Sequence, residues 1–329
     1  MSWEPGLFKI KKPTIPPTPT IPAFDYIVDI YSDKVVVTNP DGTTTQLSTI
    51  ADLNNWLRNI TGKRIRVNAN VDVYDDLVFT PNEYWIFGEW IHGNVYLLSG
   101  KHTIISFTRL GDQSYRAFVS NYDPQTNTYT DVSGLKLYSI YAELDIHGTS
   151  DMVLRDILIY VEQTYVSYIK YIVGDVYMRG GYINFTGVTL RNAHIDASVL
   201  ELSNVASSGG TGTWFIKTLN AFISGAVDAS NTGFAALYLR VSALISVGAN
   251  SSAMINLPAI NHPTLLYRVV SVGVRKGTLP GCVYVDPLPS GVTWYFDDVN
   301  RRIVINNATT GSYDIDVVCE ITTIFAVVV

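Results

Sequence analysis

Apolar and polar residues alternate along the second half of the chain. From Ala235 to Asn250 the odd positions are apolar throughout, whereas the even positions are mostly polar or small. Successive side chains of a strand point to opposite faces, so this pattern predicts extended chain with one buried face and is incompatible with a helix. Leu237 and Ile245 should therefore point into a core.

Similar segments recur upstream from about residue 134, each built as a strand, a polar corner and a second strand. A Leu-Arg pair marks this junction at Leu154, Leu190 and Leu239. The pairs are 36 and 49 residues apart, which fits about two coils each if one coil takes roughly 20 residues. Gly- and Ser-rich stretches such as 207–212 separate the segments and predict turns.

This recurring pattern of strands, polar corners and turns resembles the coils of right-handed parallel β-helices, the family that includes pectate lyases and viral tailspikes. It is clearest in the stretch Gly187-Val188-Thr189-Leu190-Arg191-Asn192-Ala193-His194-Ile195. The resemblance covers a little over a third of the chain and includes no catalytic motif. It implies a shaft over residues 63–258, in which inward side chains stack into one continuous core.

Composition supports an all-β fold. The 329 residues are 47% hydrophobic and only 16% charged, and Tyr is the commonest aromatic at 21. The abundance of Val, Ile, Thr and Tyr favours strands over helices, and the length allows two or three domains.

Charge and hydropathy limit the partners. The net charge is −6, and no run of Lys or Arg exceeds two residues, so we expect no nucleic-acid partner. No stretch approaches the roughly 20 apolar residues of a membrane span, and the N-terminus lacks the pattern of a secretory signal. The protein is therefore expected either to be used without classical secretion, as virion parts are, or to have lost its signal.

The first 24 residues are rich in proline. Pro fixes φ and removes a hydrogen-bond donor, so residues 1–24 should form an extended strap with no core of its own. Such a strap could lie along a neighbouring subunit or dock into a larger particle, and a plain linker is the alternative. The candidate anchoring residues are Pro13, Pro16, Pro17 and Pro19.

Residues 25–62 predict a strand pair followed by one short amphipathic helix. Thr49 and Asp52 have capping-box spacing at its start, and Gly62 ends it. A helix directly before the first strand resembles the entry of tailspike β-helices, where such a helix covers the open end of the coil. Further along, the polar residues 121–130 predict a loop that protrudes from the shaft.

Residues 259–329 predict five short strands and a small β-sandwich. The run from Leu288-Pro289-Ser290-Gly291 to Gly311-Ser312-Tyr313 resembles the immunoglobulin-like domains of surface adhesins, although residues 298–301 replace the usual Gly-rich turn. Cys282 and Cys319 lie in two of these strands and could form a disulfide or remain free thiols. Without a CxxC pair no metal site is predicted.

Three polar clusters are candidates for chemistry. Glu143, Asp145 and His147 share one strand parity, Asn192, His194 and Asp196 share another, and Asp72, Asp75 and Asp76 lie near the start. If the first two clusters were stacked on one face, Asp145, His147, His194 and Asp196 would provide an acid/base set for glycoside cleavage. The alternative is that outward positions of a coil are simply polar. The patterns of pectate lyases, polygalacturonases, serine hydrolases and phosphate loops are absent, and no cofactor is implied.

Outward tyrosines are candidates for binding. Tyr129, Tyr160 and Tyr165 could stack on sugars or pack against an identical subunit, and aromatic enrichment at interfaces favours the second role. The order of strap, helix, shaft and sandwich resembles viral tailspikes and fibres, and the composition weakly resembles structural proteins of archaeal viruses. That resemblance implies a homotrimer.

The resulting hypothesis is a virion surface protein, such as a tailspike, fibre or turret component. It would attach to host surface glycan or surface layer, and its strap would contact other virion proteins. Its location would be the virion surface or the extracellular space. The sequence leaves open whether the protein is an enzyme and favours a non-enzymatic role. The alternatives are a β-helix polysaccharide lyase or hydrolase and a cellular adhesin or pilus-like subunit.

Overall fold

The computed structural model describes residues 22–208, 212–218, 220–230, 234–257, 260–261, 265–279, 282–297 and 299–323. The candidate anchoring prolines 13, 16, 17 and 19 lie outside these residues. The protein is nearly all β, with 63% strand and 4% helix. Within the described ranges, no helical segment has the length and hydropathy that crossing a bilayer demands.

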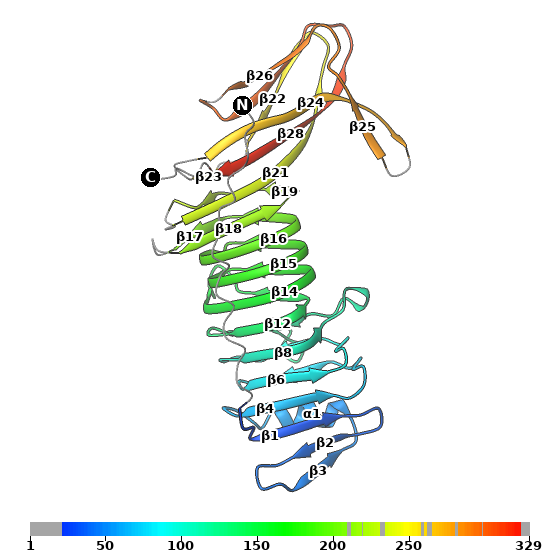
Figure 1. Ribbon diagram of the computed structural model, residues 1–329, viewed down its shortest axis with the longest axis vertical. Coiled ribbons are helices and arrows are strands. Elements are labelled where there is room, and N and C mark those ends of the chain that lie inside the picture. The colour runs from blue at the N-terminus through cyan, green and yellow to red at the C-terminus, as the bar shows by residue number, and fades with distance from the viewer. Residues whose placement is uncertain are drawn as a thin grey trace, which may run out of the picture.

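The centre of the molecule is a parallel β-helix of about 8 turns, which forms a straight shaft (Figure 1). One ladder of parallel strands, here called sheet 1, runs along its whole length. Its strands are β1 (Tyr26–Ile30), β4 (Arg64–Ala69), β6 (Glu83–Gly88), β8 (Thr103–Leu110), β12 (Lys136–Ala142), β18 (Thr213–Thr218) and the first parts of β14 (Leu154–Lys170), β15 (Ile172–Thr186), β16 (Thr189–Ser203) and β21 (Phe234–Val247).

A second parallel ladder, here called sheet 2, follows the next side of each coil. It consists of β5 (Leu77–Phe79), β7 (Val95–Leu97), β9 (Val119–Ser120), β13 (Leu144–His147), the later parts of β14 to β16, and β19 (Ala221–Ile223). The short strands β17 (Val205–Ser207), β20 (Val227–Asp228) and β23 (Ile260–Asn261) form part of the third side.

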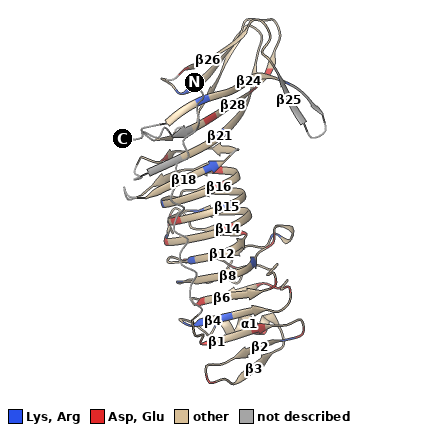
Figure 2. Cartoon of the chain, in the orientation of Figure 1, with Lys and Arg blue, Asp and Glu red and all other residues tan. Residues whose placement is uncertain are grey.

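The core is a column of inward side chains from successive coils. In sheet 1, Leu137 pairs in register with Ile159, Ile159 with Val176, Val176 with Ala193 and Ala193 with Trp214, and all five are buried. Burying one large aliphatic side chain contributes roughly 1.5–3 kcal/mol, so the column is the main source of stability. Charged side chains are sparse along the shaft strands (Figure 2).

The N-terminal elements extend sheet 1 and add one helix. Strands β1, β2 (Val35–Thr38) and β3 (Thr44–Leu47) form an antiparallel meander. The predicted helix is present as α1 (Ile50–Leu57), with the predicted capping box: Thr49 Oγ1 accepts a hydrogen bond from the Asp52 amide, and the Asp52 carboxylate accepts one from the Thr49 amide. Its buried residues Leu53 and Leu57 belong to the shaft core.

The predicted protruding loop lies between β8 and β12. The chain forms a short 3₁₀ helix, η1 (Gln113–Tyr115), and then a small hairpin of β10 (Tyr122–Asp123) and β11 (Thr128–Tyr129). It projects from the side of the shaft (Figure 1).

Sheet 1 ends within β21, which corrects the prediction that residues 63–258 form stacked coils throughout. Residues 234–239 continue sheet 1 in parallel, but residues 238–247 pair antiparallel with β28 (Tyr313–Thr323). Alternation specifies which face of a strand is buried and not the direction of its partner. Leu237 is buried in the shaft as predicted, whereas Ile245 is half-buried and packs on the core of the C-terminal sheets.

The C-terminal region contains two antiparallel sheets, which lie at the top of Figure 1. One extends from β21 through β28 to β24 (Leu265–Leu279) and β25 (Cys282–Asp286), and the other comprises β22 (Ser251–Asn256), β27 (Arg302–Asn307) and β26 (Val292–Asp297). Cys319 is a free, buried thiol, which is one of the two states that the sequence left open for it. Burial raises the pKa of Cys319 to about 11.

Candidate functional site

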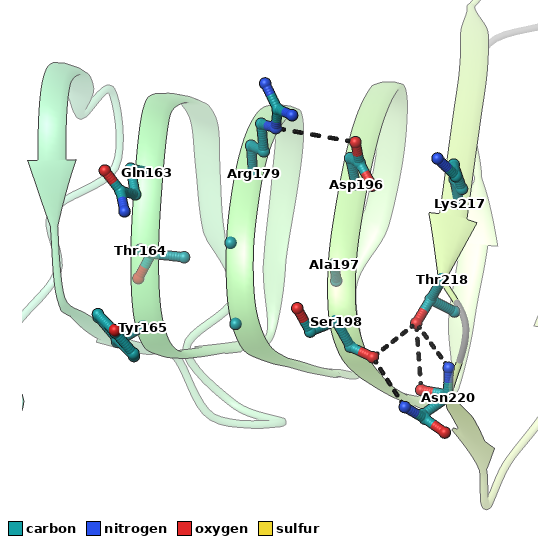
Figure 3. Close-up of a pocket in the computed structure, with 12 residues that line it drawn as sticks. Gln163, Thr164, Tyr165, Arg179, Asp196, Ala197, Ser198, Lys217, Thr218 and Asn220 are labelled. Atoms are coloured by element: carbon teal, nitrogen blue, oxygen red, sulfur yellow. Dashed lines mark hydrogen bonds and ion pairs between the residues drawn. The ribbon is translucent and has the colours of Figure 1, made fainter.

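A groove of about 520 Å³ crosses the coils at the corner where sheet 1 turns into sheet 2 (Figure 3). It is built from β14, β15, β16 and β18, so four successive coils contribute to it. The side chains that give it its chemistry are Gln163, Tyr165, Arg179, Asp196, Lys217 and Asn220. This hollow is named the corner groove.

Small side chains create the corner groove. The four coils place small residues at one register position of the corner, namely Thr164, Gly180, Ala197 and Thr218. The side chains at this position therefore have little volume. A Cβ at Gly180 would overlap the carbonyl oxygen of Thr164. The hollow is therefore a consequence of backbone packing and cannot be filled by a side chain at this position.

Polar side chains line the hollow on both sides. Arg179 points towards Asp196 on the next coil, with Nε 3.8 Å from Oδ2, and Lys217 follows Asp196 in register (Figure 3). The side chains of Arg179 and Asp196 are 77% and 41% exposed, so this ion pair is weak and both groups can turn to a ligand. At the far end, Asn220 Nδ2 donates to the carbonyl oxygen of Ser198 at 3.3 Å.

Tyr165 supplies an aromatic surface at the margin of the groove. It is 56% exposed, which is unusual for so large a ring on a well-packed coil. An exposed ring next to amide, carboxylate and guanidinium groups suits a ligand that has one apolar face and several hydroxyl-bearing faces. The ring packs on the apolar face, and the polar groups bind the hydroxyl groups.

A second hollow of about 450 Å³ lies on the outer face of sheet 1 and shares Arg179 and Asp196 with the corner groove. Tyr160, Tyr177 and His194, which are register partners, form its other side. Burial lowers the pKa of His194, and the nearby Asp196 charge only partly offsets this. His194 and Asp196 therefore do point outward from one strand, as predicted.

The predicted pair Asp145 and His147 is also outward, but on sheet 2. Asp145 Oδ1 lies 2.9 Å from His147 Nε2, in a contact that lacks hydrogen-bond alignment. Tyr129, from the protruding hairpin, donates to Asp145 Oδ2 at 3.1 Å and packs on the His147 ring with centroids 4.4 Å apart. Burial and the Asp145 charge raise the pKa of Tyr129 to about 12. Tyr129 thus closes a small cluster with these residues.

The two candidate acid/base pairs do not meet, so the condition under which they would form one acid/base set is not fulfilled. Asp145 belongs to the sheet 2 row of Tyr168, Asn184 and Glu201, whereas Asp196 belongs to sheet 1. Their strands are three coils apart, a separation of about 14 Å along the shaft alone at roughly 4.8 Å per coil.

Glu143 is a second correction, because it was assigned to the outward parity and is fully buried. It lies at the corner, where strand alternation is interrupted. Its carboxylate accepts hydrogen bonds from the amides of Tyr165 at 3.2 Å and Val166 at 2.6 Å and from the Tyr141 hydroxyl. Burial raises its pKa, and these hydrogen bonds oppose that rise. Glu143 thereby anchors the backbone that carries Tyr165.

The same corner continues downward as a buried polar pair, His92 with Asp112, that the sequence analysis missed. His92 Nδ1 lies 2.6 Å from Asp112 Oδ2, and the imidazole ring stacks between Tyr74 and Trp90 with centroids 4.6 and 4.2 Å away. Asp72 accepts a hydrogen bond from the Trp90 amide, so it links coils. The signal in the sequence was Trp90, an aromatic residue two positions before His92 and two positions after the end of β6.

Among the residues that the structure describes, no group of three or more His, Cys, Asp or Glu side chains is placed to hold a metal ion.

Comparison of the chain with protein-family models, with curated proteins and with solved structures finds no match.

Proposed function

We propose that this protein is an attachment protein whose shaft binds a neutral surface polysaccharide in the corner groove. The observation that carries the proposal is the position of the exposed Tyr165 ring at the margin of a polar groove that crosses four coils. A chain of sugar rings is long and regular, and a groove across stacked coils offers it repeated, similarly spaced contacts.

The mixed charge of the groove favours a neutral ligand. Arg179 and Lys217 alternate with Asp196 along the column, so neither a polyanion nor a polycation gains a uniform field. Each of these groups can instead bind hydroxyl groups as a charge-assisted donor or acceptor.

The elongated shaft supports a role at a surface. We propose that the protein is a virion surface component, such as a tailspike, fibre or turret part, in which right-handed shafts pack as a trimer and present the groove to the host. In this arrangement α1 covers one end of the coil stack, the C-terminal sheets form a sandwich at the other, and the N-terminal strap joins the shaft to the particle. We do not extend the proposal to glycan cleavage, because the two candidate acid/base pairs lie on different sheets.

The test is affinity electrophoresis of the full chain in gels containing dextran, mannan or xylan, with polygalacturonate as an anionic comparison. Retardation by at least one neutral polymer is expected, and Tyr165→Ala should weaken it at least tenfold. Phe222→Ala is the matched control, because Phe222 is 54% exposed and lies outside the corner groove. Equal loss in both variants, or binding to polygalacturonate alone, would contradict the proposal.

A further inference from the structure

One outward row of sheet 1 is aromatic or aliphatic over seven successive coils. The row, here called the aromatic column, is set by register pairing and consists of Trp85, Ile105, Tyr138, Tyr160, Tyr177, His194 and Phe215. Ring centroids are 6.5 Å apart between Tyr138 and Tyr160 and 6.1 Å between Tyr160 and Tyr177. Outward positions of a free coil are usually polar, so this column calls for a partner.

The lower end of the column is covered. Trp85 and Ile105 are only 2% and 8% exposed, although their parity is outward and neither belongs to the shaft core. Phe24 packs edge-on against Trp85 with ring centroids 6.1 Å apart, and the Ala23 carbonyl accepts a hydrogen bond from Arg64. The chain therefore arrives at the base of the column as it leaves the strap.

The strap sequence carries prolines at a fixed interval. Pro13, Pro16, Pro19 and Pro22 are each three residues apart. A polyproline II helix has three residues per turn, so these four rings would share one face of it, whereas Pro17 would lie on another. Proline-rich segments of this kind bind surfaces lined by aromatic side chains at low entropic cost.

The spacing of the prolines matches the spacing of the coils. One polyproline II turn advances about 9.3 Å, and two coils advance about 9.6 Å. From Pro22 to Pro13 the helix would span about 28 Å, while the six steps from Trp85 to Phe215 span about 29 Å. Successive prolines of the shared face would therefore meet every second side chain of the column.

We propose that residues 13–22 dock along the aromatic column of their own chain as a polyproline II helix. Pro22 then lies near Trp85, Pro19 near Tyr138, Pro16 near Tyr177 and Pro13 near Phe215. The hollow of about 450 Å³ beside Tyr160 and Tyr177 receives the side of the helix that faces Arg179. Residues 1–12 extend past the column and stay available to a larger particle. The docking is argued from the aromatic column and does not rest on what the corner groove binds, although the hollow and the corner groove share Arg179 and Asp196.

Hydroxyl-radical footprinting of the full chain tests the docking. Tyr138 and Tyr177 should react at least threefold more slowly in the native chain than in the Pro16→Ser/Pro19→Ser variant, while Tyr165, which lies around the corner, should react equally in both. An unchanged circular dichroism spectrum would verify that these variants keep the fold.

Two further measurements make the result specific. The single variants Pro16→Ser and Pro17→Ser each remove one proline ring, but from different faces of the helix. Only Pro16→Ser should therefore expose Tyr177. Equal exposure in both, or no exposure in either, would overturn the docking. Protection that disappears on hundredfold dilution would place the strap on a second copy and would overturn docking on its own chain.

Discussion

Gly180 and Thr164 are register partners on successive coils, and their backbones are so close that a Cβ on Gly180 would overlap the Thr164 carbonyl oxygen. This contact sits at the corner where sheet 1 turns into sheet 2. The corner groove exists because two coils touch there through backbone alone, and the bulkier side chains of Tyr165 and Arg179 stand at its margins.

Gly180→Ala should therefore lower both stability and polysaccharide binding. Forcing the coils apart costs about 1–3 kcal/mol, as for other overpacked sites, and the displaced backbone moves the groove. Urea denaturation followed by circular dichroism measures the first effect and affinity electrophoresis the second. Gly248→Ala is the control, because its Cβ would meet only Ser251 Oγ, at 3.2 Å. A Gly180→Ala protein as stable as that control would show that the corner adapts easily.

Two aspartates of neighbouring coils should differ sharply in their contribution to stability. Asp175 is 8% exposed and accepts hydrogen bonds from the Asn192 amide at 3.0 Å and from Arg191 Nε at 3.0 Å. Asp175→Ala leaves the Asn192 amide without its acceptor, whereas Arg191, whose side chain is 60% exposed, turns to water, so the substitution should cost about 1–3 kcal/mol. Asp196→Ala removes only a weak, exposed pair with Arg179 and should change the free energy of unfolding by less than about 0.5 kcal/mol. Urea denaturation measures the difference, and the Asp175→Ala protein should have a clearly lower midpoint than the Asp196→Ala protein.

Strand alternation predicted most of the shaft. The outward parity of Asp145 with His147 and of His194 with Asp196 is confirmed, as is the inward position of Leu237. These assignments succeed because side-chain direction on a strand is a local property of the backbone. The capping box of α1 is local in the same way and was equally readable.

The wrong predictions concern residues whose surroundings depend on pairing between segments that are distant in the sequence. Glu143 sits at a corner, where the chain turns and parity is lost, so its burial depends on the amides of the next coil. Residues 240–247 alternate as well as any shaft strand, yet β28, about 70 residues later, is their partner. The corner groove was not predicted because it depends on which small residues become register partners. Register partners on successive coils are 16 or more residues apart, and this variable spacing hides the register in the sequence.

Glu143→Ala should lower both the stability of the protein and its binding of polysaccharide in the corner groove. The substitution leaves the amides of Tyr165 and Val166 and the Tyr141 hydroxyl without their acceptor, which should cost about 3 kcal/mol. Because Tyr165 is held through its backbone, polysaccharide binding should fall as well. Glu201→Ala is the matched control, since Glu201 is half-buried on sheet 2 and accepts from Asn184 Nδ2. Binding that survives in the Glu143→Ala protein would show that the position of Tyr165 does not depend on this carboxylate.

His102 should make the shaft sensitive to acid. It is 1% exposed, Nε2 donates to the Leu98 carbonyl oxygen at 2.5 Å, and burial lowers its pKa from 6.5 to about 4. The folded chain thus holds a neutral ring, while the unfolded chain takes up a proton below about pH 6.5. This histidine's contribution is therefore complete above pH 6.5 and is lost as the pH falls towards 4, by up to about 3 kcal/mol. His102→Gln keeps a donor for Leu98 and cannot titrate in this range. Urea midpoints at pH 7.5, 6, 5 and 4 should fall more steeply for the native chain than for the variant, and parallel slopes would show that His102 is protonated equally in both states.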